Sequence, residues 1–161
     1  VHHPAVATRM HMMQAVGCSP IATAWEHGQA HVRPVRPDSI AKSLAIGNPA
    51  DGLYSLRVIR ASDGTAYAVP ESEVVGGIKL LAETEGIFTE TAGGVVISGL
   101  KHLAETGAIK HDELTVVYIT GNGLKTQEAV ESVVNPLSIK PTMTSFETAL
   151  KDRESQEAGV G

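Results

Sequence analysis

The sequence predicts an α/β fold in which a parallel sheet lies between two layers of helices, a three-layer sandwich. Short apolar segments alternate with helical segments along most of the chain, the order that is typical of parallel strands joined by helices. Residues 115–119 (TVVYI) are apolar and mostly β-branched, the composition of a strand that is buried on both faces. Glycine occurs 16 times and aromatic residues make up only 4% of the chain, so we expect an aliphatic core and many short turns.

The N-terminal part of the chain predicts one strand and three helices. A strand is expected over residues 9–16, where an apolar segment leads into a glycine turn. A helix is expected over 19–28, because it opens with a capping serine followed by proline. Residues 31–37 contain two prolines and are expected to form a loop. Further helices are predicted over 40–45 and 53–62, the second from apolar residues at helical spacing.

The central part of the chain has the most regular pattern. A strand over 66–69 precedes a helix that starts with Pro70 and two acidic residues and stops at Gly86, since acids are favourable at a helix start and glycine at its end. The remaining predicted elements are a strand over 87–89, a helix opened by Gly93-Gly94 and closed by Gly107, and the strand 115–119.

The alternation of strand-like and helical segments weakens beyond Lys125. We therefore interpret the 161 residues as one domain over 1–150, followed by a flexible tail over 151–161.

Charge and composition exclude several classes of function. The net charge is −5 without a basic cluster, whereas nucleic-acid binding needs a concentrated positive surface. The uncharged stretches are too short and too often broken by glycine to cross a membrane. Cys18 is the only cysteine, so we expect no disulfide framework and a cytoplasmic location. His27 and His31 have the spacing of helical metal ligands, but Gly28 between them ends the predicted helix, so no metal site is expected.

Glycine-rich turns mark the places where a ligand could bind. They lie at residues 15–18, 45–49, 89–94 and 119–123, each at a strand exit or a helix entry. In an open α/β sheet, ligands bind at such turns beyond the carboxyl ends of the strands. Any one of these turns is also explained by ordinary turn chemistry, so the spacing alone leaves both readings open.

Three segments together resemble one family. Residues 39–49 (SIAKSLAIGNP), 85–95 (EGIFTETAGGV) and 120–125 (TGNGLK) resemble the threonine synthases in this order, and the resemblance covers most of residues 9–130. These enzymes belong to the fold type II, or tryptophan synthase β-like, enzymes that use pyridoxal 5'-phosphate (PLP). The resemblance implies that the chain is the C-terminal part of the cofactor domain of a lyase of threonine biosynthesis. Its reaction would convert O-phospho-L-homoserine, a small-molecule substrate, and water to L-threonine and phosphate.

The resemblance also implies roles for three residues in cofactor binding. Thr120 matches the residue whose hydroxyl meets the pyridine nitrogen, where a neutral partner moderates the cofactor as an electron sink. Gly47 matches the glycine whose backbone lies beside the cofactor ring. Glu90 matches an acid that faces the cofactor from the strand-to-helix turn. Asn48 is a further pocket candidate by position.

The family's Schiff-base lysine and its phosphate-binding loop are expected upstream of this chain. We therefore expect no catalytic residue in the 161 residues and no activity from them alone. An incomplete sheet exposes an edge and an apolar face, so we expect a homo-oligomer.

Two alternatives remain open. A threonine or serine dehydratase would use the same cofactor scaffold, but the segment GIFTETAGG argues against it. A non-catalytic, truncated α/β module kept for oligomerisation or ligand sensing is the alternative from another class.

Overall fold

A two-stranded parallel sheet organises the first of two compact units. The computed structural model describes residues 8–134 and 137–158, and the chain divides into a unit that ends at Ala129 and a unit that begins at Val130. In the first unit, strand β1 (Met12–Ala15) pairs in parallel with β2 (Ala66–Val69).

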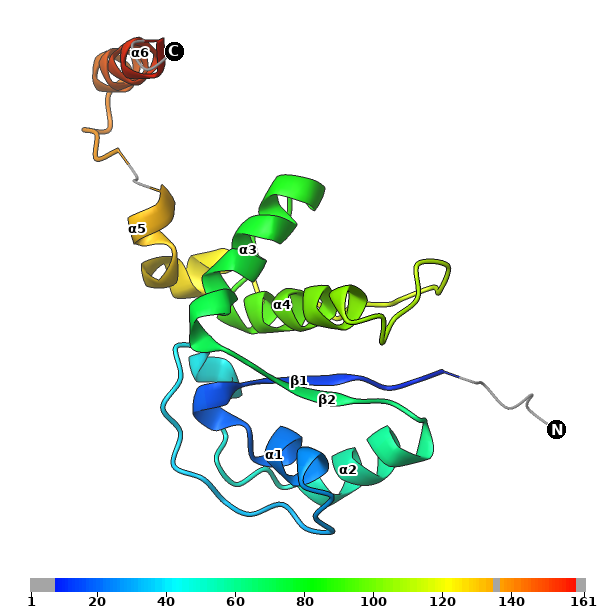
Figure 1. Ribbon diagram of the computed structural model, residues 1–161. Helices are drawn as coiled ribbons and strands as arrows, with labels where there is room; N and C mark the ends of the chain where they lie inside the picture. The colour runs from blue at the N-terminus through cyan, green and yellow to red at the C-terminus, as the bar shows by residue number, and fades with distance from the viewer. Residues whose placement is uncertain (1–7, 135–136, 159–161) are drawn as a thin grey trace, which may run out of the picture. The chain divides into compact units, whose positions relative to one another are not determined.

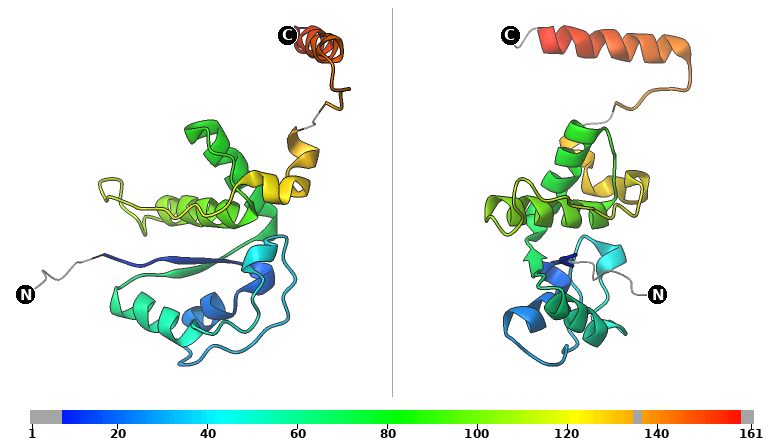
Figure 2. Two further views of the ribbon diagram at one scale, coloured as in Figure 1. Left: turned by 180° about the vertical axis from the view of Figure 1, so that it is seen from behind. Right: turned by 90° about the vertical axis from the view of Figure 1, so that its right-hand side faces the viewer.

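Helices cover both faces of this sheet. Helices α1 (Pro20–Glu26) and α2 (Gly52–Ala61) lie on one side, and α4 (Thr91–Glu105) lies on the other (Figure 1). Helix α3 (Glu71–Glu85) packs on α4, as the views in Figure 1 and Figure 2 show. The layers run from helices through strands to helices, so the predicted α/β fold with parallel strands is confirmed.

Two apolar clusters fill the space between the layers. The first cluster joins α1, α2 and β2, and the partly buried Trp25 of α1 packs against it. The first cluster contains Ile21, Ala22, Ala24, Leu56, Ile59 and Ala66. The second contains Ala15, Ala41, Val69, Val74 and Val95. The core is aliphatic, as the composition predicts.

Helix α1 begins at Pro20 as predicted, but its amides are capped by a different residue. The side chain of Ser19 makes no capping bond. Instead, Gln14 Oε1 on β1 accepts hydrogen bonds from the N–H groups of Ile21 at 2.9 Å and Ala22 at 3.0 Å. These first-turn donors have no partner within the helix, so the side chain from β1 fixes α1 to the sheet.

Helices α3 and α4 touch through residues without bulky side chains. A β-carbon on Gly77 would lie 2.3 Å from the carbonyl oxygen of Gly94. Ser98 donates a hydrogen bond to the carbonyl oxygen of Glu73 at 2.8 Å. Helix α3 ends at Gly86, which has a φ of 67°, a conformation that favours glycine. Helix α4 begins at Thr91, two residues before the predicted Gly93, because the glycines serve close packing rather than the helix start.

Two of the predicted strands are wrong. Residues 115–119 form no strand in the described chain (Figure 1), and Val116 and Tyr118 are each 75% exposed. Residues 87–89 make only a single antiparallel bridge, between Thr89 and Asn122. A strand needs a continuous ladder of hydrogen bonds to a neighbouring strand. Residues 115–119 pair with no described strand, and the pairing of residues 87–89 with residues 121–123 stops after one bridge.

Short 3₁₀ helices replace or extend several predicted turns. The predicted helix over 40–45 is the 3₁₀ helix η2 (Lys42–Leu44). The turns after β1 and after residue 122 continue as η1 (Val16–Cys18) and η3 (Gly123–Ala129).

The second unit is helical. It contains α5 (Glu131–Val134) and α6 (Met143–Ala158). The hydroxyl of Thr142 accepts a hydrogen bond from the N–H of Ser145 at 3.3 Å, which caps the start of α6. Helix α6 runs across residue 150, where the tail was expected to begin, and the boundaries 1–150 and 151–161 stay predictions.

No helix formed by the described residues is both long enough and apolar enough to cross a membrane. Over residues 8–134 and 137–158, no group of three or more His, Cys, Asp or Glu side chains could hold a metal ion.

Candidate functional site

The candidate site lies at the edge of the sheet where both strands end. β1 leads into η1 and β2 leads into α3 at this edge, and the start of α4 lies beside them (Figure 1). Both η2 and η3 contact α4. The glycine-rich turns after β1, before α4 and before η3 therefore lie near the carboxyl ends of the strands, where α/β folds bind ligands.

Glu90 is a buried acid at the start of α4. It has extended backbone dihedrals (φ −68°, ψ 173°) and is only 5% exposed. Its N–H donates a hydrogen bond to the carbonyl oxygen of Gly121 at 3.1 Å. The Nζ of Lys125 lies 3.8 Å from Glu90 Oε2, and this lysine is itself largely exposed. Among the described residues, Lys125 is the cationic neighbour of this buried carboxylate, and burying a carboxylate beside a largely exposed cation is a costly arrangement.

The segment around Glu90 is locked to the segment that follows Thr120. Thr89 Oγ1 donates to the carbonyl oxygen of Gly121 at 3.0 Å, and Gly123 N–H donates to the carbonyl oxygen of Phe88 at 3.0 Å. A third contact comes from Thr91, the first residue of α4, whose N–H donates to Thr126 Oγ1 at 3.1 Å. These contacts make one rigid corner of two segments that lie about thirty positions apart in the sequence.

Thr120 lies at this corner with an exposed side chain. The turn after it is closed by Asn122, whose Oδ1 accepts a hydrogen bond from Leu124 N–H at 2.9 Å. Among the described residues, the Thr120 hydroxyl makes no hydrogen bond, so the turn does not use it.

Gly47 occupies a place that only glycine fits. Its carbonyl oxygen accepts a hydrogen bond from Val35 N–H at 2.9 Å, and a β-carbon on it would lie 2.0 Å from the Val35 carbonyl oxygen. No contact joins Gly47 to Glu90 or Thr120 among the described residues. The segment containing Gly47 reaches the corner through η2, where Lys42 Nζ lies 3.7 Å from Glu128 Oε1 on η3.

Two features of this edge were missed in the sequence. The first is Glu71, whose carboxylate binds groups from two other segments; the sequence shows only an acid in the first turn of a helix. The second is Thr91, which is fully buried and whose hydroxyl has no partner among the described residues. Neither feature has a local sequence signal, because the partners of Glu71 and the burial of Thr91 both come from the fold.

Cys18 lies at the same edge and is buried. Burial raises the pKa of its thiol, and the negative charge of Glu71 raises it further. The thiolate is the reactive form of cysteine, so both effects disfavour reactivity of this side chain.

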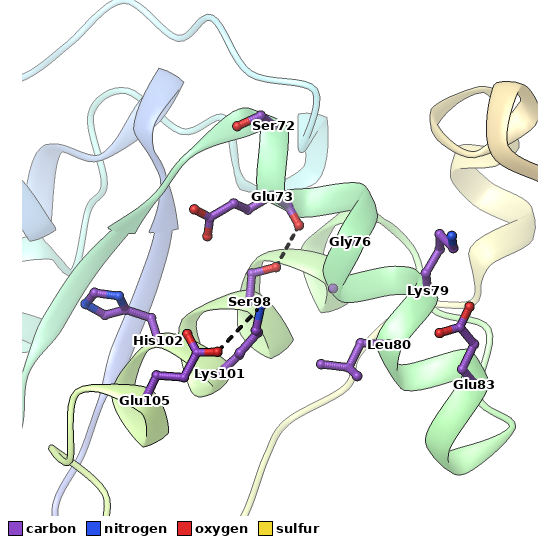
Figure 3. Close-up of a pocket in the computed structure, with 11 residues that line it drawn as sticks. Ser72, Glu73, Gly76, Lys79, Leu80, Glu83, Ser98, Lys101, His102 and Glu105 are labelled. Atoms are coloured by element: carbon purple, nitrogen blue, oxygen red, sulfur yellow. Dashed lines mark hydrogen bonds and ion pairs between the residues drawn. The ribbon is translucent and has the colours of Figure 1, made fainter.

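A separate hollow lies between α3 and α4, with a volume of about 550 Å³. Figure 3 shows two interactions among the residues that line the hollow. Ser98 donates a hydrogen bond to the Glu73 carbonyl oxygen, and Lys101 forms an ion pair with Glu105. The hollow contains none of the predicted cofactor residues.

Comparison with known proteins identifies the class. The sequence model of the family described as pyridoxal-phosphate dependent enzyme matches residues 2–121. The chain belongs to this family. Its fold is similar to that of maize serine racemase, with a TM-score of 0.54 at 16% identity over 78% of this chain and 39% of that one. This likeness supports the fold type II assignment.

The similar sequences within the class are threonine synthases. The threonine synthase of Methanocaldococcus jannaschii is 38% identical over 89% of this chain and 36% of its own length. That of Methanosarcina acetivorans is 36% identical over 78% of this chain and 31% of its own. The threonine synthase of Bacillus sp. strain ULM1 is 33% identical over 86% of this chain and 37% of its own length.

The chain spans about a third of the length of these relatives. The resemblance found in the three sequence segments is confirmed, and PLP is the cofactor of the family.

Proposed function

We propose that this chain forms part of the cofactor domain of a threonine synthase, a lyase that converts O-phospho-L-homoserine and water to L-threonine and phosphate. Support comes from the names of the relatives and from the three segments that resemble the family in the same order. Bound PLP supplies an electron sink for this chemistry.

The observation that carries the proposal is the corner formed by residues 88–91 and 120–126. It brings a buried carboxylate at Glu90 next to a glycine at position 121 and leaves the hydroxyl of Thr120 unused by its own turn. A heteroaromatic cofactor with a ring nitrogen fits this donor set, because the hydroxyl can donate one hydrogen bond to the nitrogen. Thr120 is the residue that we propose binds and orients the ring.

Glu90 and Gly47 have distinct roles in this proposal. Glu90 is proposed to place its carboxylate beside the ring, because its N–H donates to the Gly121 carbonyl oxygen and its Oε2 lies 3.8 Å from Lys125 Nζ. Gly47 is proposed to form a wall of backbone beside the ring, and its missing side chain leaves room for the Val35 carbonyl oxygen. Asn48 is exposed next to it.

The covalent link to the cofactor is proposed to come from a lysine outside these 161 residues. Lys42 and Lys125 both lie near the corner but pair with Glu128 and Glu90, respectively, and neither resembles the family's lysine motif. The chain by itself is therefore proposed to be inactive. A homo-oligomeric state and a cytoplasmic location remain part of the proposal.

Product analysis of the holoenzyme tests the function. We expect release of phosphate from O-phospho-L-homoserine together with formation of threonine. Release of ammonia from threonine or serine without phosphate release would favour a dehydratase. Absence of both reactions in a protein that still assembles would favour a non-catalytic module.

The isolated 161-residue chain provides a second test. After incubation with PLP and desalting, we expect no retained absorbance band of a protein-bound cofactor. A borohydride-reducible adduct at one specific lysine of this chain would contradict the proposal that the linking lysine lies elsewhere.

A further inference from the structure

The carboxylate of Glu71 joins three segments at the edge where the strands end. Glu71 is the first residue of α3 and is separated from the end of β2 only by Pro70. Its Oε1 accepts a hydrogen bond from Gly17 N–H at 3.0 Å, in the turn after β1. Its Oε2 accepts from Ser39 Oγ at 3.2 Å and from Ile40 N–H at 3.0 Å. Both carboxylate oxygens are thus used by groups outside α3.

This arrangement differs from an ordinary helix start. An acid in the first turn usually interacts with the dipole and the amides of its own helix, but the start of α3 has no side-chain cap. Every partner of the Glu71 carboxylate is a donor, and a carboxylate offers only acceptors. An amide at this position would present an NH₂ group to one of these donors.

We call the three hydrogen bonds accepted by the Glu71 carboxylate the clamp. The residues around the clamp are tightly packed. The N–H of Asp38 donates to the carbonyl oxygen of Gly17 at 2.8 Å. A β-carbon on Gly17 would lie 1.7 Å from the Asp38 carbonyl oxygen and 2.8 Å from Glu71 Oε1. Ser39 Oγ also accepts a hydrogen bond from Ala41 N–H at 3.0 Å. The turn after β1 and residues 38–41 are therefore held in one arrangement.

Residues 38–41 lead directly into the segment that carries Gly47. Ala41 is fully buried against Val69, Val74 and Val95, and η2 begins at the next residue. We propose that Glu71 is a positioning residue that fixes residues 38–48, and with them the Gly47 wall, against the carboxyl edge of the sheet. This inference rests on the proposed function, because it assigns the purpose of the clamp to cofactor binding.

Glu71→Gln in the holoenzyme tests the inference, with Glu73→Gln as the matched control. The control makes the same change of charge two residues along α3, at an exposed side chain that makes no hydrogen bond within the described residues. Hydrogen exchange of the peptide covering residues 36–48 and the dissociation constant of PLP are measured for both variants. We expect Glu71→Gln to speed exchange in this peptide and to weaken PLP binding, each about tenfold. Glu73→Gln should leave both unchanged.

Ser39→Ala keeps the test decisive if Glu71→Gln does not fold. It removes the Ser39 donor to Glu71 and the acceptor of the Ala41 N–H, and it leaves the two backbone donors to Glu71. We therefore expect a change of about threefold in the same two quantities. Unchanged exchange in residues 36–48 in the folded variants would overturn the clamp. Faster exchange with unchanged PLP affinity would overturn the positioning role and leave the proposed function intact. A wild-type protein that binds no PLP would overturn the proposed function, while the exchange measurement would still report on the clamp.

Discussion

The carboxylate of Glu90 occupies the space in which a side chain at Gly121 would begin. A β-carbon built on Gly121 would lie 1.9 Å from Glu90 Oε1, 2.1 Å from its Cδ and 2.6 Å from its Cγ. All three nearest atoms belong to Glu90, and the Glu90 N–H also donates to the Gly121 carbonyl oxygen. The glycine that precedes Asn122 is therefore required by a side chain from another segment, in addition to any requirement of its own turn.

A substitution cycle at these two positions tests this relationship. Gly121→Ala should lower the free energy of unfolding by about 1–3 kcal/mol, because the added methyl group forces a buried carboxylate out of its place. Combined with Glu90→Ala, the same substitution should cost much less, since the clashing atoms are gone. Urea denaturation of the two single variants and the double variant measures the coupling. Equal costs of Gly121→Ala with and without Glu90 would show that the glycine serves only the backbone of its turn.

Adjacent glycines on α3 should respond in opposite ways. A β-carbon on Gly76 meets no atom within 4 Å, so Gly76→Ala should stabilise the protein by about 0.5–1 kcal/mol through helix propensity alone. A β-carbon on Gly77 would lie 2.3 Å from the Gly94 carbonyl oxygen. Gly77→Ala should therefore destabilise by about 1–3 kcal/mol, because α3 and α4 must move apart. Thermal denaturation of the two variants checks the sign, and a stabilising Gly77→Ala would mean that the helices do not cross at this point.

The stability of the first unit should depend on the charge of His11. Burial lowers the pKa of His11, the charge of Arg9 lowers it further, and Glu113 acts in the opposite direction. Its Nδ1 lies 2.7 Å from Thr65 Oγ1 and accepts a hydrogen bond from Thr65 N–H at 3.3 Å, a bond that a proton on Nδ1 would remove. The folded pKa lies below the unfolded one, so the unfolded state takes up the proton first.

This contribution is complete above the ordinary histidine pKa of about 6.5 and is lost as the pH falls below it. We expect the free energy of unfolding to fall more between pH 7.5 and 5.5 in the wild type than in His11→Gln. His27→Gln is a suitable control, because this histidine is exposed at the end of α1. An identical decrease in wild type and His11→Gln would contradict the assignment.

Local signals in the sequence predicted the helices well. Gly86 ends α3 with a positive φ, and Pro20 opens α1, both as expected from the residues themselves. The segment 115–119 shows the limit of such reasoning. Its composition favours a strand, but pairing depends on a neighbour that composition does not reveal, and no described segment supplies one.

The candidate site was also predictable from the sequence only in part. Glu90, Thr120 and Gly47 lie in turns that the sequence marked with glycines, and their roles toward PLP stay predictions. The clamp of Glu71 could not be predicted, because its partners lie 31 to 54 positions away and leave no local pattern. The same holds for the capping of α1 by Gln14, where a strand residue does what Ser19 was expected to do.

The hydroxyl of Thr120 provides the most direct test of the cofactor assignment. The alternative is that this threonine only stabilises its turn, but the turn is closed by Asn122, and the Thr120 hydroxyl has no hydrogen bond among the described residues. Thr120→Val keeps the shape of the side chain and removes its donor, so a buried ring nitrogen would lose its partner in the holoenzyme. The free-energy barrier of the affected step should rise by about 1–3 kcal/mol. Thr120→Ser keeps the hydroxyl and should leave the barrier nearly unchanged. Both variants should unfold at the wild-type temperature, because the side chain is exposed in this structure. Equal rates of phosphate release from O-phospho-L-homoserine in the Val and Ser variants would remove Thr120 from the cofactor site.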